Sequence, residues 1–163
     1  MASAYSVFAN HGVKMEPHAI LKITDRDGNV ISERQERKEV VISKEIADGI
    51  NSMLLEVVED GTGKGGKING WEVAGKTGST QVPIKGGKGT KEQWFVGYTP
   101  QLVGAVWMGY DRTDSRHYLT TTSSEGAALI FKDFMSEALR NVEPASFGLH
   151  SVASEKDNGK KKR

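Results

Sequence analysis

The sequence contains no cysteine among its 163 residues. That absence excludes disulfide scaffolds, thiolate zinc sites, iron–sulfur clusters and cysteine nucleophiles. No run approaches the roughly 18 apolar residues of a membrane-spanning helix, so we predict no transmembrane segment in this chain. A large charge of one sign is missing too. The 22 basic and 21 acidic residues give a net charge of +1, which argues against a nucleic-acid partner.

Length and composition indicate one globular domain followed by a basic tail. Domains commonly contain about 100–200 residues, and 19 glycines add to the 37% of hydrophobic residues. Without the terminal run Lys160–Arg163, 18 basic and 21 acidic residues give a net charge of −3. Residues 151–163 are polar, rich in lysine and without periodicity. We therefore predict a disordered tail, which we place at residues 143–163.

The first residues predict the end of a helix rather than a signal peptide. Ala4, Val7 and Phe8 share a helix face, and Gly12 suits the position after the C-cap. The basic and apolar regions of a signal peptide are missing here. Because a helix of about ten residues is marginal alone, we expect a chain cut from a longer one. A short terminal helix docked on the domain is the alternative.

A hairpin is predicted over residues 20–31. Apolar residues flank Asp25–Asn29, whose Asp-Gly pair is typical of a tight turn. The acidic turn resembles a calcium-binding loop, but its glycine comes two positions early and the final glutamate is missing. We therefore predict a turn and no calcium site.

Two longer helices are predicted from apolar periodicity. The first has Ser43 as its N-cap and ends at Gly61, and the second begins with a capping box of Thr122 and Glu125. Each has a stripe that we expect to face the core: Ile46, Ile50, Met53, Leu54, Val57 and Val58 in the first, and Ala127, Phe131, Phe134 and Ala138 in the second.

Three strands are predicted between these helices, over residues 71–80, 93–99 and 102–110. The short link Pro100–Gln101 makes the last two an antiparallel hairpin. The third strand is apolar on both faces, so we expect it at the centre of a sheet, covered by helices. The fold class is therefore α+β, with an antiparallel sheet of three strands flanked by helices.

Gly70–Thr77 matches the G-x-x-x-x-G-K-[ST] pattern of a phosphate-binding loop. Such a loop needs an apolar strand before it and a helix N-terminus after it. Here a loop of glycine and lysine precedes the pattern, and Gly78–Pro83 cannot begin a helix. We therefore favour a strand, and a nucleotide hydrolase is the least favoured function.

As a strand, the same segment offers an edge for binding a substrate. Thr77 and Ser79 are two residues apart, so their hydroxyls share a face, and Lys76 adds a positive charge. Gly78 leaves room for close approach of a ligand. An edge strand can bind an extended peptide, and these groups suit a peptide that ends in a carboxylate. An exposed strand without a ligand is the alternative on spacing alone.

The other polar and aromatic residues predict no second site. Four histidines lack both paired ligand spacing and an acidic partner pattern, so we expect structural or solvated side chains and no metal or cofactor: His11, His18, His117 and His150. A solvated loop is expected for Asp111, Asp114 and Arg116, and a core position for Trp94 and Trp107.

Three segments together resemble the transpeptidase domain of class A penicillin-binding proteins. They are Gly61–Gly63, Ala74–Gln81 with its Lys-Thr-Gly triplet, and Trp94–Pro100, in the order and spacing of that family. Ala2–Asn10 and Pro17–Ile20 are also similar to the family, so the resemblance covers roughly residues 2–140.

The resemblance implies a D,D-transpeptidase that cross-links peptidoglycan stem peptides through an acyl-serine and is acylated by β-lactams. It implies that Lys76 contributes to the electrostatics around the nucleophile, and that Thr77, Gly78, Ser79 and Thr80 bind substrate. Thr77 and Ser79 would hold the substrate carboxylate, and the backbone N–H of Ser79 would form half of an oxyanion hole. The implied location is the extracytoplasmic face of the bacterial membrane, through an anchor outside this sequence.

Two motifs of that family are absent from the sequence. No serine has lysine three residues on, as S-x-x-K requires, or asparagine two residues on, as S-x-N requires. The nucleophilic serine is therefore missing, and covalent catalysis needs it. We expect residues 1–142 to be the C-terminal portion of a transpeptidase domain, inactive alone and partnered by the missing N-terminal part. A non-catalytic module that binds a peptide or a partner is the alternative.

Overall fold

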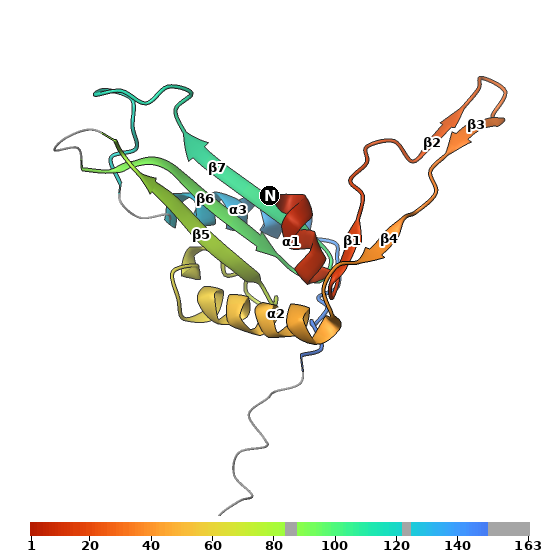
Figure 1. Cartoon of the computed structure of the whole chain (residues 1–163), viewed down its shortest axis with the longest axis horizontal. Coiled ribbons are helices and arrows are strands. Elements are labelled where there is room, and N and C mark those ends of the chain that lie inside the picture. The colour runs from red at the N-terminus through yellow and green to blue at the C-terminus, as the bar shows by residue number, and fades with distance from the viewer. Residues whose placement is uncertain (84–87, 122–124, 150–163) are drawn as a thin grey trace, which may run out of the picture.

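The computed structural model describes residues 1–83, 88–121 and 125–149 (Figure 1). It confirms the predicted α+β class. The helical elements are α1 (Ala2–Ala9), α2 (Lys44–Glu59), the 3-10 turn η1 (Lys64–Gly66) and α3 (Glu125–Ala138). The strands are β1 (Val13–Met15), β2 (Lys22–Thr24), β3 (Val30–Glu33), β4 (Lys38–Val40), β5 (Ala74–Gln81), β6 (Thr90–Tyr98) and β7 (Val103–Gly109).

A three-stranded sheet forms the centre of the body. Its order is β5-β6-β7 with antiparallel pairs, which confirms the three predicted strands. Helix α3 covers one face, where the ring centroids of Phe131 and Phe95 are 4.9 Å apart. Helix α1 lies on the other, where Tyr5 is 6.3 Å from Tyr98. Phe95 and Tyr98 are three residues apart in a strand and so point to opposite faces, which gives the sheet a core on each side.

The larger core lies between the sheet and α3. Its buried residues are Val58, Ile68, Val73, Phe95, Ala127, Ala128, Phe131, Met135 and Leu139. Gly97 lies directly beneath Phe131, because a Cβ at this position would come within 2.7 Å of the Phe131 Cζ. The close packing of α3 on β6 therefore requires glycine at residue 97.

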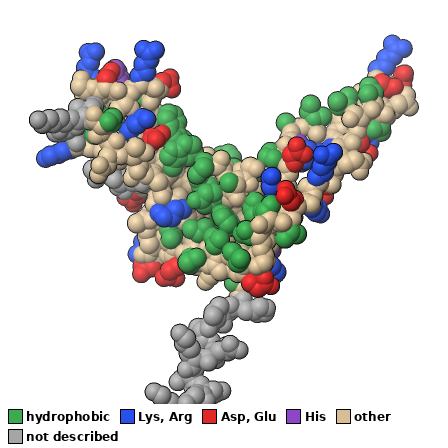
Figure 2. Space-filling model, viewed as in Figure 1, with side chains coloured by type: hydrophobic (Ala, Val, Ile, Leu, Met, Phe, Trp, Pro, Cys, Tyr) green, Lys and Arg blue, Asp and Glu red, His purple; other side chains and the backbone are tan. Residues whose placement is uncertain are grey.

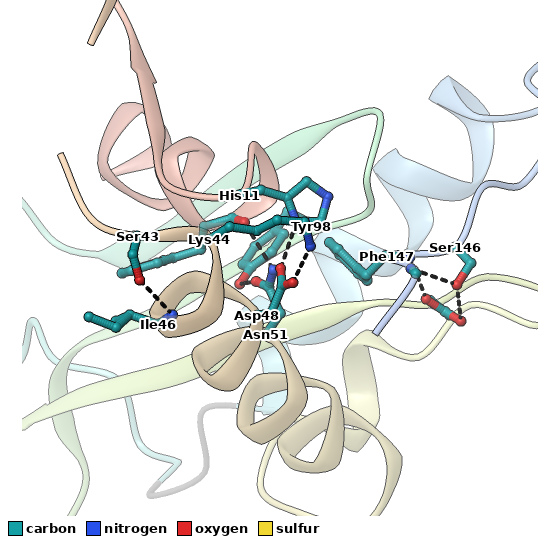
Figure 3. A network of polar contacts seen from close by, with 12 residues as sticks. His11, Ser43, Lys44, Ile46, Asp48, Asn51, Tyr98, Ser146 and Phe147 are labelled. Atoms are coloured by element: carbon teal, nitrogen blue, oxygen red, sulfur yellow. Dashed lines mark hydrogen bonds and ion pairs between the residues drawn. The ribbon is translucent and has the colours of Figure 1, made fainter. Parts of the chain in front are cut away.

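The second core surrounds Tyr98 on the opposite face. The Tyr98 hydroxyl donates a hydrogen bond to Asn51 Oδ1 at 2.7 Å, and Asn51 Nδ2 donates to the Phe8 carbonyl at 2.9 Å (Figure 3). Burial raises the pKa of Tyr98, so its hydroxyl keeps its proton and remains a donor. This buried chain of hydrogen bonds joins β6, α2 and α1.

Phe147 completes the second core, with its ring centroid 5.7 Å from that of Tyr98. The Glu72 carboxylate accepts hydrogen bonds from Ser146 Oγ at 2.9 Å and from the Phe147 backbone N–H at 2.8 Å. Placing the start of the tail at residue 143 was therefore wrong, because an apolar ring within a polar stretch anchors the chain as far as Leu149. The predicted disorder of residues 150–163 lies outside the described residues.

The predicted hairpin is confirmed, and it projects from the body (Figure 1). Strands β2 and β3 pair antiparallel above a second pair, β1 with β4. Asp25 shapes the turn, since its Oδ1 accepts hydrogen bonds from the backbone N–H groups of Asp27 and Asn29 at 2.9 and 2.8 Å. We call residues 16–37 the arm. Because β2 and β3 are exposed along their whole length, the arm has no core of its own.

Both core-facing stripes were predicted on partly wrong residues. In α2, Ser43 caps the helix as expected, but Ile46 and Met53 are exposed while Ala47 and Asn51 are buried. In α3, Phe134 and Ala138 are exposed, while Met135 and Leu139, the residue that follows the helix, are buried. In both helices the buried stripe is therefore shifted by about one residue from the predicted stripe. The shift arises because the surface on which a helix packs determines which of its side chains are buried. The predicted cap Thr122 lies outside the described residues.

Helix α1 ends one residue earlier than predicted. Its C-cap is Asn10, so His11, with φ 51°, takes the next position in place of Gly12. The His11 N–H bonds to the Phe8 carbonyl, and the Gly12 N–H to the Val7 carbonyl, as in a Schellman motif. Gly12 is needed for a different reason: at φ 94°, a Cβ there would lie 2.2 Å from the Ile42 carbonyl oxygen.

Strand β7 is at an edge of the sheet, not at its centre as predicted from its apolar composition. Trp107, expected in the core, is 42% exposed, and Trp94 is partly buried. Figure 2 shows hydrophobic side chains gathered on the side of the body that carries α1. An apolar edge strand is unusual, because free edges are ordinarily protected by charge, proline or a covering element.

Candidate functional site

The candidate site lies on β5, the strand at the other edge of the sheet. Thr77 pairs with Phe95 and Ser79 with Gln93, so the two hydroxyl side chains share one face, as the sequence predicts. Lys76 and Gly78 alternate with them and belong to the opposite face. The strand therefore carries two hydroxyls on one face, and the exposed side chain of Lys76 starts from the other.

Lys76 turns back toward the hydroxyl face. Its Nζ donates a hydrogen bond to the Thr77 carbonyl at 3.0 Å and to Thr77 Oγ1 at 3.4 Å. A cation placed beside a hydroxyl at a strand edge suits recognition of an anionic group.

Thr62 joins the site from the loop between α2 and η1. Its Oγ1 lies 3.1 Å from Thr77 Oγ1. Thr62 lies in the segment Gly61–Gly63, which resembles the family, but no role was predicted for it. The signal was its position between Gly61 and Gly63 directly after a helix, because flanking glycines allow the backbone to approach a neighbouring strand.

Two glycines of β5 have different surroundings. A Cβ on Gly75 would lie 2.8 Å from Phe95 Cζ and 3.1 Å from the Val96 carbonyl oxygen, so packing requires glycine there. A Cβ on Gly78 would meet only Trp94 Cβ, at 3.5 Å, an ordinary contact. Gly78 is therefore not required by the packing of this chain, which is compatible with the predicted space for a ligand.

Thr80 differs from the other predicted substrate-binding residues. Its hydroxyl donates to Glu92 Oε1 at 3.1 Å, and the indole N–H of Trp107 donates to Glu92 Oε2 at 3.0 Å. The hydrogen bond from Trp107, followed by that from Thr80, holds the pKa of Glu92 below its usual range. The ionised Glu92 of β6 therefore links the end of β5 to β7 by hydrogen bonds. The Thr80 hydroxyl takes part in this contact between strands.

The strand excludes a phosphate-binding loop at Gly70–Thr77. Residues from Ala74 onward pair in register with β6 rather than leading into a helix. Backbone N–H groups that form a sheet ladder are not available to cradle a phosphate. Residues 70–77 therefore do not form the phosphate-binding loop of a nucleotide hydrolase.

Two histidines have acidic partners, although no acidic partner was predicted from the sequence. His11 Nδ1 lies 2.6 Å from Asp48 Oδ1, and Asp48 also pairs with Lys44 (Figure 3). His117 Nδ1 lies 2.8 Å from Asp114 Oδ2 in an exposed loop. Hydrogen bonds, chiefly from His117, hold the pKa of Asp114 low. Within the described residues, no group of three His, Asp or Glu side chains could hold a metal ion.

Sheet, flanking helices and the Lys-Thr-Gly edge strand define the class of a penicillin-binding transpeptidase domain. The family model of the penicillin-binding protein transpeptidase domain matches residues 1–136. The chain therefore belongs to the penicillin-binding protein transpeptidase family.

Curated relatives agree with this assignment. Penicillin-binding protein 1F of Bacillus subtilis is 44% identical over 138 residues, which are 85% of this chain and 19% of that protein. Penicillin-binding protein 2a of Streptococcus pneumoniae is 36% identical over 159 residues, 98% of this chain and 21% of that protein. The chain thus spans about a fifth of the length of these relatives.

A solved structure gives the same result. The penicillin-binding protein PonA1 from Mycobacterium tuberculosis superimposes with a TM-score of 0.75 at 28% identity, over 90% of this chain and 39% of that chain. In the part of the chain that the structure describes, none of the helices is long and apolar enough to cross a membrane.

Proposed function

We propose that this chain supplies the substrate-binding strand of a serine-type peptidoglycan D,D-transpeptidase that is acylated by penicillin. Thr77 and Ser79 bind the terminal carboxylate of the stem peptide or the acid of a β-lactam. Lys76 stabilises negative charge near the nucleophile, and the Ser79 backbone N–H donates to the oxyanion. Gly78 leaves the strand open for the substrate, and Thr80 braces its end through Glu92.

One observation carries this proposal. Lys76 Nζ, Thr77 Oγ1 and Thr62 Oγ1 form a continuous polar cluster on an edge strand, with successive distances of 3.4 and 3.1 Å. A fixed cation beside two hydroxyls matches the chemistry of a carboxylate ligand. The cluster lacks a nucleophilic serine with a lysine base, so it can bind and polarise but cannot form an acyl-enzyme.

The nucleophile must therefore come from another part of a longer polypeptide. The match to about a fifth of each relative supports this, and so do the apolar edge of β7 and the exposed Trp107, which suit contact with further protein. We propose that the partner is the N-terminal part of the same domain. The complete enzyme would work on the extracytoplasmic face of the cell membrane, where peptidoglycan is built.

Labelling with a fluorescent penicillin tests the proposal. We expect no covalent label on the purified chain, and labelling when it is mixed with the part of Bacillus subtilis penicillin-binding protein 1F that precedes the matched segment. The label should be on the added part and should decrease when the chain carries Thr77→Val. Labelling of the chain by itself would contradict the proposed division of the site.

A non-catalytic module on the same fold is the competing function. It predicts cooperative hydrogen-exchange protection without self-association, because a complete module covers its own apolar surfaces. The exposed Trp107 and the free edge of β7 favour the transpeptidase part instead. Sedimentation and hydrogen exchange of the purified chain distinguish the two.

A further inference from the structure

The loop that follows α2 holds Thr62 beside the substrate-binding strand. Helix α2 packs along β5 (Figure 1), and the loop is tied back to the last turns of the helix. The Gly61 N–H donates a hydrogen bond to the Glu56 carbonyl at 3.2 Å. The Gly63 N–H donates to the Val57 carbonyl at 2.9 Å. Both glycines lie so close to α2 that a Cβ on either would come within 2.8 or 3.1 Å of that carbonyl oxygen. The backbone is therefore fixed on each side of Thr62.

Packing of the core fixes Thr62 relative to Thr77 as well. Val58, near the end of α2, and Phe95 of β6 belong to one buried core, and Phe95 is the register partner of Thr77. Thr62 Oγ1 lies 3.1 Å from Thr77 Oγ1 and has no other hydrogen-bond partner among the residues that the structure describes. Because the Thr62 side chain is exposed, burial gives no reason for its hydroxyl.

Hydrogen bonding between Lys76, Thr77 and Thr62 has a direction that a ligand would set. The Lys76 ammonium can only donate, so Thr77 Oγ1 accepts from it, at 3.4 Å. A hydroxyl has one proton and two lone pairs, so either Thr62 or Thr77 can be the donor between them. A carboxylate can only accept. When it binds to Thr77, the Thr77 proton must point to it, and the contact with Thr62 survives only if Thr62 donates.

We propose that Thr62 is a positioning residue, whose hydroxyl donates to Thr77 Oγ1 and so directs the Thr77 proton toward the carboxylate of the ligand. This rests on the proposed function, in which Thr77 binds that carboxylate. With Lys76 and Thr62 both donating, the two lone pairs of the Thr77 hydroxyl are occupied, and donation to the ligand is the one bond left to it. Hydrogen bonds in such a chain strengthen one another, so Thr62 raises the affinity for an anion without touching it.

Reversible binding of benzylpenicillin to the full 163-residue chain tests the role of Thr62. The sequence lacks the nucleophile motif, so the β-lactam is a non-covalent probe, and NMR shifts of the β5 amides give its dissociation constant. Thr62→Val keeps the shape of the side chain without the hydroxyl and should weaken binding about three- to tenfold, the range for one hydrogen bond. Thr62→Ser keeps the hydroxyl and should stay within about twofold of the parent chain. Unfolding midpoints of both variants should match that of the parent chain, because the side chain is exposed.

A double-mutant cycle separates action through Thr77 from a direct contact with the ligand. Adding Thr62→Val to Thr77→Val should cause no further loss of affinity, because no Thr77 hydroxyl is left to direct. An equal loss in both backgrounds would mean that Thr62 touches the ligand or only supports the loop, and would overturn the role of Thr62. Benzylpenicillin methyl ester is the matched uncharged probe, and Thr62→Val should change its binding by less than about twofold.

The outcomes distinguish the role of Thr62 from the proposed function. Binding that depends on Thr77 but not on Thr62 overturns the role of Thr62 and leaves the function in place. Coupled losses at Thr62 and Thr77, with no penicillin labelling of the mixture with the preceding part of penicillin-binding protein 1F, support the role of Thr62 and remove the transpeptidase function. Absence of binding, or binding that depends on neither hydroxyl, overturns both.

Discussion

The body and the arm use apolar residues in opposite ways. In the body, Phe95, Phe131 and Met135 are fully buried between the sheet and α3. In the arm, Leu21 and Ile31 are exposed, and the hairpin is shaped by the hydrogen bonds of Asp25. Because burial of apolar area contributes most of the stability of a fold, we infer that the body determines global stability. The arm is held by the local hydrogen bonds of its turn, and its strands bury no side chain.

Phe131→Ala should cause the largest loss of stability. Its ring contacts Phe95 and covers Gly97, so truncation leaves a cavity that the sheet cannot fill, at a cost of about 3–5 kcal/mol. Phe134→Ala on the same helix is the matched control, since that side chain is 62% exposed; its effect should stay within about 0.5 kcal/mol. Urea unfolding measures both. Equal losses would mean that the exposed face of α3 is covered by other protein in solution.

This pair also shows what the sequence could not predict about the fold. Phe131 was predicted correctly, but the spacing of Phe134 and that of Met135 both fit a helix face. The choice between them depends on Gly97 and Gly104 of the sheet, whose missing side chains make room for the ring of Phe131. Such a fit joins residues far apart in sequence. The Asp25 turn and the helix cap at Ser43 were predictable because their chemistry is local.

Gly75→Ala should have the next largest effect. The new methyl group would lie 2.8 Å from Phe95 Cζ, and the resulting strain should destabilise the chain by about 1–3 kcal/mol. Gly78→Ala, three residues along β5, meets only an ordinary contact and should change stability by less than about 0.5 kcal/mol. Thermal or urea unfolding measures this difference. A large loss at Gly78 would show that the open face of β5 is packed.

The candidate site was predictable to a similar extent. The shared face of Thr77 and Ser79 follows from the period of a strand, and the pairing with β6 confirms it. Thr62 lies fifteen residues earlier in the chain, and its contact with Thr77 depends on how α2 packs along β5. The hydrogen bond from Thr80 to Glu92 also depends on strand register, which hydroxyl spacing does not report.

Asp48→Asn should remove a pH-dependent contact between α2 and His11, which follows α1. Burial acts to raise the pKa of Asp48, but hydrogen bonds with Lys44 and His11 outweigh it, and the pKa is lowered from its usual 3.8. A carboxyl whose pKa is lower in the folded state stabilises the fold above its unfolded pKa and loses this effect as pH falls. The parent chain should therefore be more stable than the variant at pH 7, and the difference should shrink below about pH 4. A constant difference from pH 7 to 2, measured by urea unfolding, would contradict this assignment.

Asp25→Ala should have the smallest effect on global stability. It tests whether the arm can open locally while the body stays folded. Loss of the two backbone hydrogen bonds should speed hydrogen exchange of the arm amides, while the free energy of global unfolding changes by less than about 0.5 kcal/mol. Asp27→Ala is the control, because the Asp27 carboxylate only faces Arg26, at 3.8 Å, on the same exposed turn. A global loss as large as that of Gly75→Ala would mean that the arm unfolds together with the body. Its apolar strands would then contribute to the stability of this chain even though they are exposed.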